Sequence, residues 1–275
     1  MSGLTIDHAV TRTVRDSAAL LDAVAGPALG DPYWAPPQER PYVEEVGVDP
    51  GHLRIAFTYK RLYGEEPIDP DCVAAVEDAA KLCAELGHEV VEAAPAAVNG
   101  EQLLEAFTIM WEAGTANGID SVAVLTGQQP SPDMVEPLTW ALYQDGKKRD
   151  ASAYLTAVAN LQLMSRGIAQ FHEQYDLWLT PTLGMPPLPL GSFEGTPDNP
   201  RAGFDKAGEF VPFTPIQNAT GQPGMSVPLY WNDAGLPIGV HFVGRFGDEA
   251  TLFRVAAQLE EARPWGSRRP AVSAV

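Results

Sequence analysis

Ser226 is the residue of this sequence that comes nearest to the nucleophile of a hydrolase. A serine nucleophile needs a neighbouring base, and many hydrolases place it at the centre of a Gly-x-Ser-x-Gly turn. In GMSVP, residues 224–228, a proline stands where the second glycine belongs, so the stretch favours a buried strand. A Ser-x-x-Lys spacing is also absent from the sequence. A newly assembled triad of Ser226, His241 and an acid such as Asp205 remains open as one hypothesis.

Patterns for metal binding and for acid–base catalysis are not seen either. The five histidines are scattered along the sequence, and none forms the helical pairs typical of a zinc site. Acidic pairs such as Glu44-Glu45 and Glu260-Glu261 are adjacent rather than facing, which is typical of solvated surface. No glycine-rich loop has the spacing that cradles a phosphate. The sequence therefore predicts neither a metal site nor a cofactor.

Composition limits the class of partner and the compartment. The net charge of −18 argues against nucleic acid, because phosphates need a basic face. No apolar run approaches the ~18 residues of a membrane helix, and residues 1–13 lack the pattern of a secretory signal. Cys72 and Cys83 stand on one predicted helix and are expected to be reduced apolar residues. We therefore expect no membrane partner and a cytoplasmic protein.

The spacing of apolar residues predicts strands that alternate with helices. A strand at 53–57, a helix opened by Asp69-Pro70 and a strand at 88–92 form a βαβ unit, which implies parallel pairing. Strands at 225–229 and 237–243 are separated by the turn sequence NDAG, which favours antiparallel pairing. Both kinds of pairing are thus predicted.

Helices and one long loop account for most of the remaining chain. The first helix begins at Thr13 as its cap and carries an apolar stripe that includes Ala18, Leu20 and Val24. Further helices are predicted at 101–114, 132–144, 152–175 and 249–262, with a strand at 177–180. Residues 183–212 are dense in proline and glycine and predict a long irregular loop.

Several stretches resemble the landmarks of the amidase-signature family. HAVTRTVRDSAALLDAVAGP, residues 8–27, resembles the segment that follows the catalytic serines in that family. Five later stretches resemble the distal landmarks of the family, in the same order and spacing. They are TPT at 180–182, PIQNATGQPGMSVPL from 215, GLPIGVHFVGR from 235, DEATLFRVAAQLEEARPW from 248 and Arg-Pro at 269–270. The resemblance covers nearly the whole chain. It implies an α/β class: one partial domain over 1–275, the C-terminal part of the amidase-signature fold, with a mixed β-sheet flanked by helices on both faces.

The resemblance also implies which chemistry this sequence lacks. Family members cleave amides with a Ser–cis-Ser–Lys triad, in which the lysine deprotonates the bridging serine and that serine activates the nucleophile. The triad and its Gly/Ser-rich loop lie in the N-terminal half of the family domain, before the segments resembled here. No such loop is present, and none of the lysines matches the catalytic one: Lys60, Lys81, Lys147, Lys148 and Lys206. No catalytic residue is therefore carried over, and the chain by itself is expected to be inactive.

The resemblance does imply that this chain contributes part of the wall of a substrate pocket. The candidates to face a bound small-molecule amide are Phe107, Met110, Trp111, Thr182, Gln217 and Asn218. Plain core packing is the alternative for the three residues at 107–111, and a capping or turn hydrogen bond is the alternative for Asn218.

We therefore expect a C-terminal fragment of an amide hydrolase, which needs its N-terminal half from upstream in the same chain or from another polypeptide. Without that half, unpaired strand edges and apolar faces would recruit a partner, so a homodimer or a complementing chain is expected. The isolated chain is expected to be marginally stable. The alternative is a non-catalytic remnant or a module that binds small amides or peptides.

Overall fold

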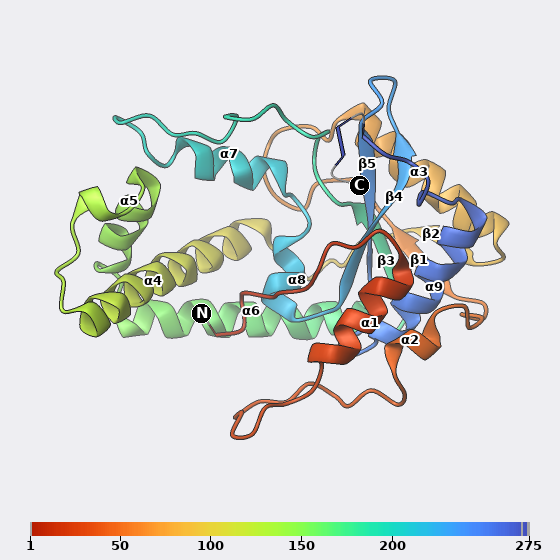
Figure 1. Ribbon diagram of the computed structural model, residues 1–275, viewed down its shortest axis with the longest axis horizontal. Coiled ribbons are helices and arrows are strands. Elements are labelled where there is room, and N and C mark those ends of the chain that lie inside the picture. The colour runs from red at the N-terminus through yellow and green to blue at the C-terminus, as the bar shows by residue number, and fades with distance from the viewer. Residues whose placement is uncertain (1, 271, 274–275) are drawn as a thin grey trace.

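A mixed β-sheet lies at the centre of the computed structural model, which describes residues 2–270 and 272–273 (Figure 1). Within these residues the sheet has five strands in the order β2-β1-β3-β5-β4. β1 pairs in parallel with β2 and β3, whereas β5 pairs antiparallel with β3 and β4. The strands are β1 (Arg54–Phe57), β2 (Glu89–Glu92), β3 (Leu177–Pro181), β4 (Gly224–Trp231) and β5 (Pro237–Val243). The predicted mixed sheet is confirmed.

Local sequence signals set the two connections that the sequence predicted best. In the βαβ unit, the Asp69 side chain accepts a hydrogen bond from the Asp71 amide and Pro70 opens α3 (Pro70–Glu85). In the hairpin, the Leu236 amide donates to the Asn232 side chain, and Gly235 adopts a φ of 76° that favours glycine. Parallel and antiparallel pairing therefore arise where they were expected.

Helices cover both faces of the sheet, as expected. The alternation of side chains along β3 sends Leu177 and Leu179 to one face and Trp178 to the other. The first face packs on α3 and on α9 (Glu249–Ala262), and we call this the first core cluster. The second face packs on α4 (Gly100–Thr126), α6 (Ala151–Phe171) and α8 (Pro215–Thr220), and we call this the second core cluster.

Helices α4, α5 (Pro137–Gly146) and α6 form an arm that extends beyond the sheet (Figure 1). The prediction that a helix ends at residue 114 is wrong, because α4 continues to Thr126 and is capped by Gly127. The region predicted as a helix over 132–144 contains a short 3₁₀ turn, Pro132–Met134, before α5 begins. α6 ends at Phe171, four residues earlier than predicted. Within the arm, α4 is therefore longer and α6 shorter than the sequence predicted.

The segment at 183–212 is not irregular throughout, because it contains α7 (Ala202–Phe210). Three donors hold the carboxyl end of this helix. Arg61 Nη2 donates to the Glu209 carbonyl at 2.6 Å, the Tyr63 hydroxyl donates to the Val211 carbonyl at 2.5 Å, and the Gly184 amide donates to the Phe210 carbonyl at 2.9 Å. Tertiary contacts therefore stabilise this short helix, which its local sequence did not predict.

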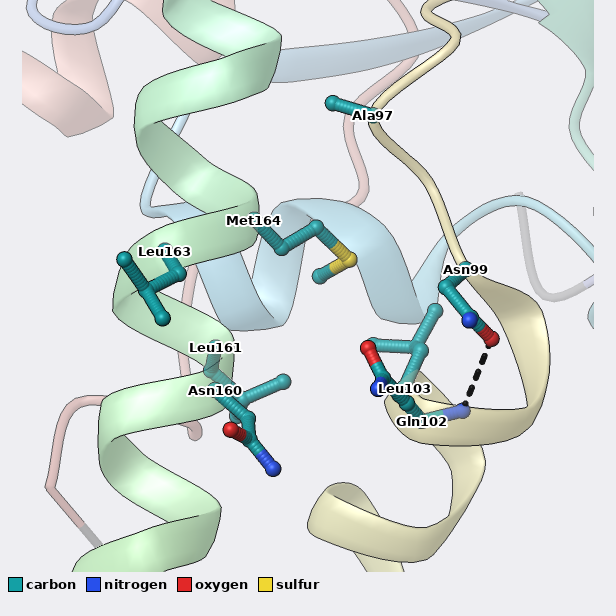
Figure 2. A pocket seen from close by; sticks show the side chains of 8 residues that line it. All are labelled: Ala97, Asn99, Gln102, Leu103, Asn160, Leu161, Leu163 and Met164. Carbon is teal, nitrogen blue, oxygen red and sulfur yellow. Dashed lines mark hydrogen bonds between the residues drawn. The ribbon is translucent and has the colours of Figure 1, made fainter.

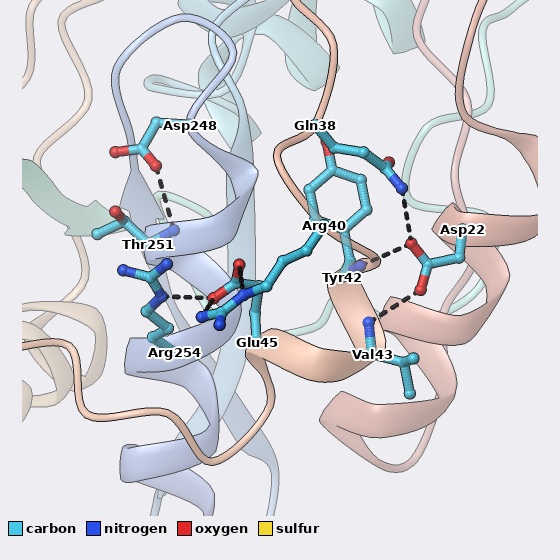
Figure 3. Close-up of polar contacts among 9 residues, drawn as sticks. All are labelled: Asp22, Gln38, Arg40, Tyr42, Val43, Glu45, Asp248, Thr251 and Arg254. Atoms are coloured by element: carbon cyan, nitrogen blue, oxygen red, sulfur yellow. Dashed lines mark hydrogen bonds and ion pairs between the residues drawn. The ribbon is translucent and has the colours of Figure 1, made fainter.

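Two short helices at the start of the chain are attached to α9 by carboxylates (Figure 3). Asp22 of α1 (Val14–Val24) accepts from the amides of Tyr42 and Val43, which open α2 (Tyr42–Glu45). Glu45 then accepts from Arg40 and from Arg254 of α9.

The apolar stripe predicted for the first helix is buried only in part. The Thr13 cap is confirmed, since its hydroxyl accepts from the Asp16 amide, and Ala18 is buried. Leu20 and Val24 are 44% and 70% exposed, so this side of α1 has no cover within the residues that the structure describes.

Candidate functional site

A pair of hydroxyl groups lies on the sheet face of the second core cluster, where β3, β5 and β4 run side by side. Thr182, which follows β3, and Ser226 of β4 place their hydroxyl oxygens 2.7 Å apart across β5, the strand that lies between β3 and β4. They meet over Gly239, where a Cβ atom would lie 2.6 Å from Ser226 Oγ and 2.9 Å from Thr182 Oγ1. Glycine is thus required at position 239 for the two side chains to meet.

Ser226 is exposed, so the prediction that it lies buried within its strand is wrong. The alternation along β4 turns its side chain to a part of the sheet face that no helix covers within the described residues. His241 stands opposite Ser226 in the strand register, and its Nδ1 lies 3.4 Å from the Thr180 hydroxyl. Burial lowers the pKa of His241 to about 4, which keeps its imidazole neutral.

The hypothesis of a triad made from Ser226, His241 and Asp205 is not supported. The hydroxyl of Ser226 pairs with Thr182, and no hydrogen bond joins it to His241 among the described contacts. Asp205 is an exposed residue of α7. A hydroxyl without a hydrogen-bonded base is a weak nucleophile, so these three residues do not form a catalytic unit.

Gln217 and Asn218 lie next to each other on α8, but their side chains have opposite surroundings. Asn218 Nδ2 donates to the Leu4 carbonyl at 2.8 Å and so ties the start of the chain to α8. Gln217 is 3% exposed, and neither amide atom has a hydrogen-bond partner in the described part of the chain. Gly221, with a φ of 70°, ends the helix by donating its amide to the Gln217 carbonyl.

The three candidates on α4 belong to the second core cluster. The rings of Phe107 and Trp111 stack with centroids 5.5 Å apart, and both side chains are half-buried. Met110 is 2% exposed and packs among the buried residues of that cluster, as the core-packing alternative predicts. With Thr182 on the sheet and α8 packed against α6, all six candidates lie on one side of the sheet. Their contact with a substrate stays a prediction.

Two pockets of the arm are lined by neighbours of the candidates on α4 rather than by the candidates themselves. Two neighbouring pockets of 290 and 340 Å³ run along the contact of α4 with α6, and Asn160 lines both. In Figure 2, Met164 of α6 points across the first pocket towards the start of α4, where Asn99 caps the helix by accepting from the Gln102 amide. Neither lining contains a candidate or a hydrogen-bonded catalytic pair.

An ionic cluster that sequence reasoning missed holds the amino end of α7. Glu112 of α4 is 2% exposed and accepts from Arg149 Nε at 2.9 Å and from Arg201 Nη1 at 2.7 Å. Arg201, which precedes α7, also lies 3.0 Å from Asp145. The partners are 37 and 89 positions from Glu112 in sequence, so no local pattern could have indicated the cluster.

The described residues contain no lysine placed to activate a serine. Every lysine of the chain is exposed, and four of them pair with surface carboxylates. No group of three metal-ligating side chains occurs among residues 2–270 and 272–273, and no helix there is long and apolar enough to cross a membrane. Burial raises the pKa values of Cys72 and Cys83 to about 12, so neither thiol is a ready nucleophile.

The fold and the sequence landmarks agree with one family of hydrolases. A model of the amidase family matches residues 3–253, and the chain belongs to that family. The sequence is 33% identical to 6-aminohexanoate-cyclic-dimer hydrolase from Paenarthrobacter ureafaciens, in an alignment that covers 98% of this chain and 56% of the relative. It is also 33% identical to a putative amidase from Synechocystis, covering 94% of this chain and 48% of that protein.

Solved structures give the same result for the fold. 6-Aminohexanoate cyclic dimer hydrolase complexed with substrate superposes with a TM-score of 0.88 at 32% identity, over 95% of this chain and 55% of that one. A bacterial aryl acylamidase of the amidase-signature family superposes with a TM-score of 0.77 at 21% identity, which bears on the fold alone. The chain thus spans about half the length of the relatives that it matches.

Proposed function

We propose that this chain forms the substrate-binding half of an amide hydrolase, and that the reacting serines and lysine belong to a second half of the amidase domain. The main support for this proposal is that the chain superposes on a substrate-bound hydrolase with a TM-score of 0.88, over 55% of that hydrolase. The second half lies upstream in the same polypeptide or in a separate one. Without it, the chain does not hydrolyse amides.

Uncovered surface supports this proposal. Large apolar side chains are exposed along the first part of the chain: Ile6, Val10, Leu20, Val24, Leu29, Tyr33 and Trp34. Seven large apolar side chains left exposed within the first 34 residues are expected where another segment covers this part of the chain. The open sheet face at Thr182 and Ser226 and the edge strand β4 offer further contact area.

The substrate class that we propose is a small-molecule amide. Thr182, Gln217 and Asn218 supply hydroxyl and amide groups that complement an amide, and the stacked pair Phe107–Trp111 supplies an apolar wall. 6-Aminohexanoate cyclic dimer is the first substrate to assay, because the relative at 33% identity carries its name. A cytoplasmic location is part of the proposal, supported by the free thiols of Cys72 and Cys83.

A binding module without catalysis is the second candidate function. It agrees with the exposure of every lysine of this chain, as the first candidate does, and differs from that candidate in what the completed domain does to a bound amide. In that case the completed domain would bind small amides and leave them intact. A homodimer that covers the open face is the partner expected under this alternative.

A fusion protein tests the proposal. The part of the Paenarthrobacter hydrolase that this chain does not match is joined to residue 1, and release of amine from the cyclic dimer and from a panel of small amides is measured. We expect no turnover by the chain alone and turnover by the fusion. Turnover by the chain alone, or a folded fusion that binds these amides without cleaving them, would overturn it.

A further inference from the structure

Helix α7 contains two glycines, and the packing of the described residues accounts for one of them. A Cβ atom at Gly203 would overlap the Phe193 carbonyl oxygen, so that position requires glycine. Gly208 is half-buried, yet a Cβ atom there would meet no atom within 4 Å, and its φ is outside the left-handed region. Alanine favours a helix over glycine. Gly208 therefore lowers the stability of α7 and leaves open space in front of it.

The amino end of α7 is attached to α4 beside Trp111. Arg201, which has helical backbone angles just before α7, donates from Nη1 to the buried Glu112 at 2.7 Å. Gly208 follows Arg201 by seven positions, about two helical turns, so both residues lie on one face of α7. Arg201 Cζ also lies 5.6 Å from the centre of the Phe204 ring, which places this ring near the same face. The face that carries Gly208 is therefore turned towards α4.

The carboxyl end of α7 is attached near the start of α4. The Tyr63 hydroxyl donates to the Val211 carbonyl, and the Tyr63 side chain packs on Gly100, where a Cβ atom would have no room. Gly100, Phe107 and Trp111 are seven and four positions apart, so they lie on one face of α4. Figure 1 shows α7 alongside α4, on the side away from α6. Between its two attachments, α7 therefore runs past the stacked pair Phe107–Trp111.

The side chains that line this part of α7 and α4 are apolar and incompletely covered. Phe107, Trp111 and Phe204 are all half-buried, and Phe204 belongs to neither core cluster. Ion pairs are found at the two ends of α7, where the charged groups neutralise one another. Aromatic rings beside open space suit the hydrocarbon part of a ligand rather than a charged group.

We infer that α7 forms the wall of the substrate pocket opposite Phe107 and Trp111, and that Gly208 is a specificity-determining residue that leaves room for the hydrocarbon part of a bound amide. The inference rests on the proposed function, which assigns Phe107 and Trp111 to the substrate, and it adds the residue that sets the width of the pocket. A larger side chain at position 208 would occupy the space that a hydrocarbon chain needs. Amides with longer chains would then be rejected, while small amides would still bind.

The fusion protein described above tests the inference through Gly208→Leu and three primary amides: acetamide, butanamide and hexanamide. Dissociation constants are measured by ligand-detected NMR, which does not depend on turnover. In the unsubstituted fusion, each added methylene should tighten binding by about twofold to fourfold. Gly208→Leu should weaken the binding of hexanamide by about tenfold or more and change that of acetamide by less than about twofold.

Gly118 of α4 provides the matched control, because it is an exposed helical glycine that also has open space at its Cβ position. Gly118→Leu should leave the dependence on chain length unchanged. Alanine at either position should raise Tm by about 1–3 °C, since it favours a helix. If the leucine variant at 208 does not fold, Gly208→Ala decides the question, with the binding of hexanamide weakened by about threefold.

Three results would overturn the inference. They are unchanged binding of hexanamide by the folded variant, an equal loss for acetamide and hexanamide, and no binding of either amide by the unsubstituted fusion. An equal loss would show that position 208 acts through the fold or through the added half. The proposed function is judged separately by turnover, so an active fusion whose Gly208→Leu variant binds hexanamide normally refutes the wall and leaves the function standing. Chain-length selectivity without turnover does the reverse.

Discussion

The carboxylate of Glu45 offers the sharpest test of how the start of the chain is attached. Its side chain is 3% exposed and receives Nε and Nη2 of Arg40 at 2.6 and 2.7 Å, and Nε of Arg254 at 2.6 Å (Figure 3). The hydrogen bonds from Arg40 are the main cause that lowers the pKa of Glu45 from 4.5 to about 2, and the bond from Arg254 adds to them. The charged form of Glu45 therefore stabilises the folded chain.

The magnitude follows from linkage between protonation and folding. A lowering from 4.5 to about 2 corresponds to about 3 kcal/mol of unfolding free energy, and partial exposure of the arginines reduces this to roughly 2 kcal/mol. Because the folded pKa is the lower one, this stabilisation is fully present above pH 4.5. It is lost as the pH falls towards 2.

The perturbation is Glu45→Gln, and the assay is urea unfolding followed by circular dichroism at pH 7, 5 and 3. We expect the variant to lose about 2 kcal/mol or more at pH 7, since two arginines keep their places without a charge to pair with. The difference from the unsubstituted chain should narrow at pH 3. The control Glu44→Gln changes an exposed neighbour and should have little effect. An equal loss at pH 7 and pH 3, or no loss at pH 7, would refute the reasoning.

Three further outcomes follow from the site. Glu112→Gln leaves Arg149 and Arg201 without their carboxylate and should cost about 3 kcal/mol in urea unfolding, and a loss below 0.5 kcal/mol would contradict the role of this cluster in holding α7. An NMR titration should find the pKa of His241 near 4. The neutral imidazole then contributes stability that is fully present above pH 6.5 and is lost as the pH falls through 4. A pKa near 6.5 would show that the imidazole is not buried. Gly239→Ala should lower stability by about 1–3 kcal/mol, and adding Ser226→Gly should recover part of the loss, whereas an unaffected single variant would argue against the close contact.

Signals carried by neighbouring residues made much of the fold predictable. The Asp69 cap, the Thr13 cap and the turn that ends at Gly235 each act within a few positions, and each was predicted from the sequence. The resemblance to the amidase-signature family added the mixed sheet with helices on both faces, and the family model that matches residues 3–253 agrees with that resemblance.

Features that depend on distant partners could not be predicted. α4 passes through Gly114 because it packs closely on α5, where a Cβ at Gly146 would lie 2.1 Å from the Glu112 carbonyl oxygen. α7 forms where Arg61 and Tyr63 donate hydrogen bonds to carbonyls at its carboxyl end. Each of these two partners lies 148 positions away in sequence. The exposure of Ser226 depends on which sheet face is covered, and the apolar run in β4 does not contain that information.

Labelling with a fluorophosphonate probe tests the central claim most directly. The probe attaches covalently to an activated serine, and peptide mass spectrometry of the labelled fusion locates it. The account predicts a label on a serine of the added half, with Ser226 and the other serines of this chain unlabelled. A label on Ser226, in the fusion or in the chain alone, would contradict it.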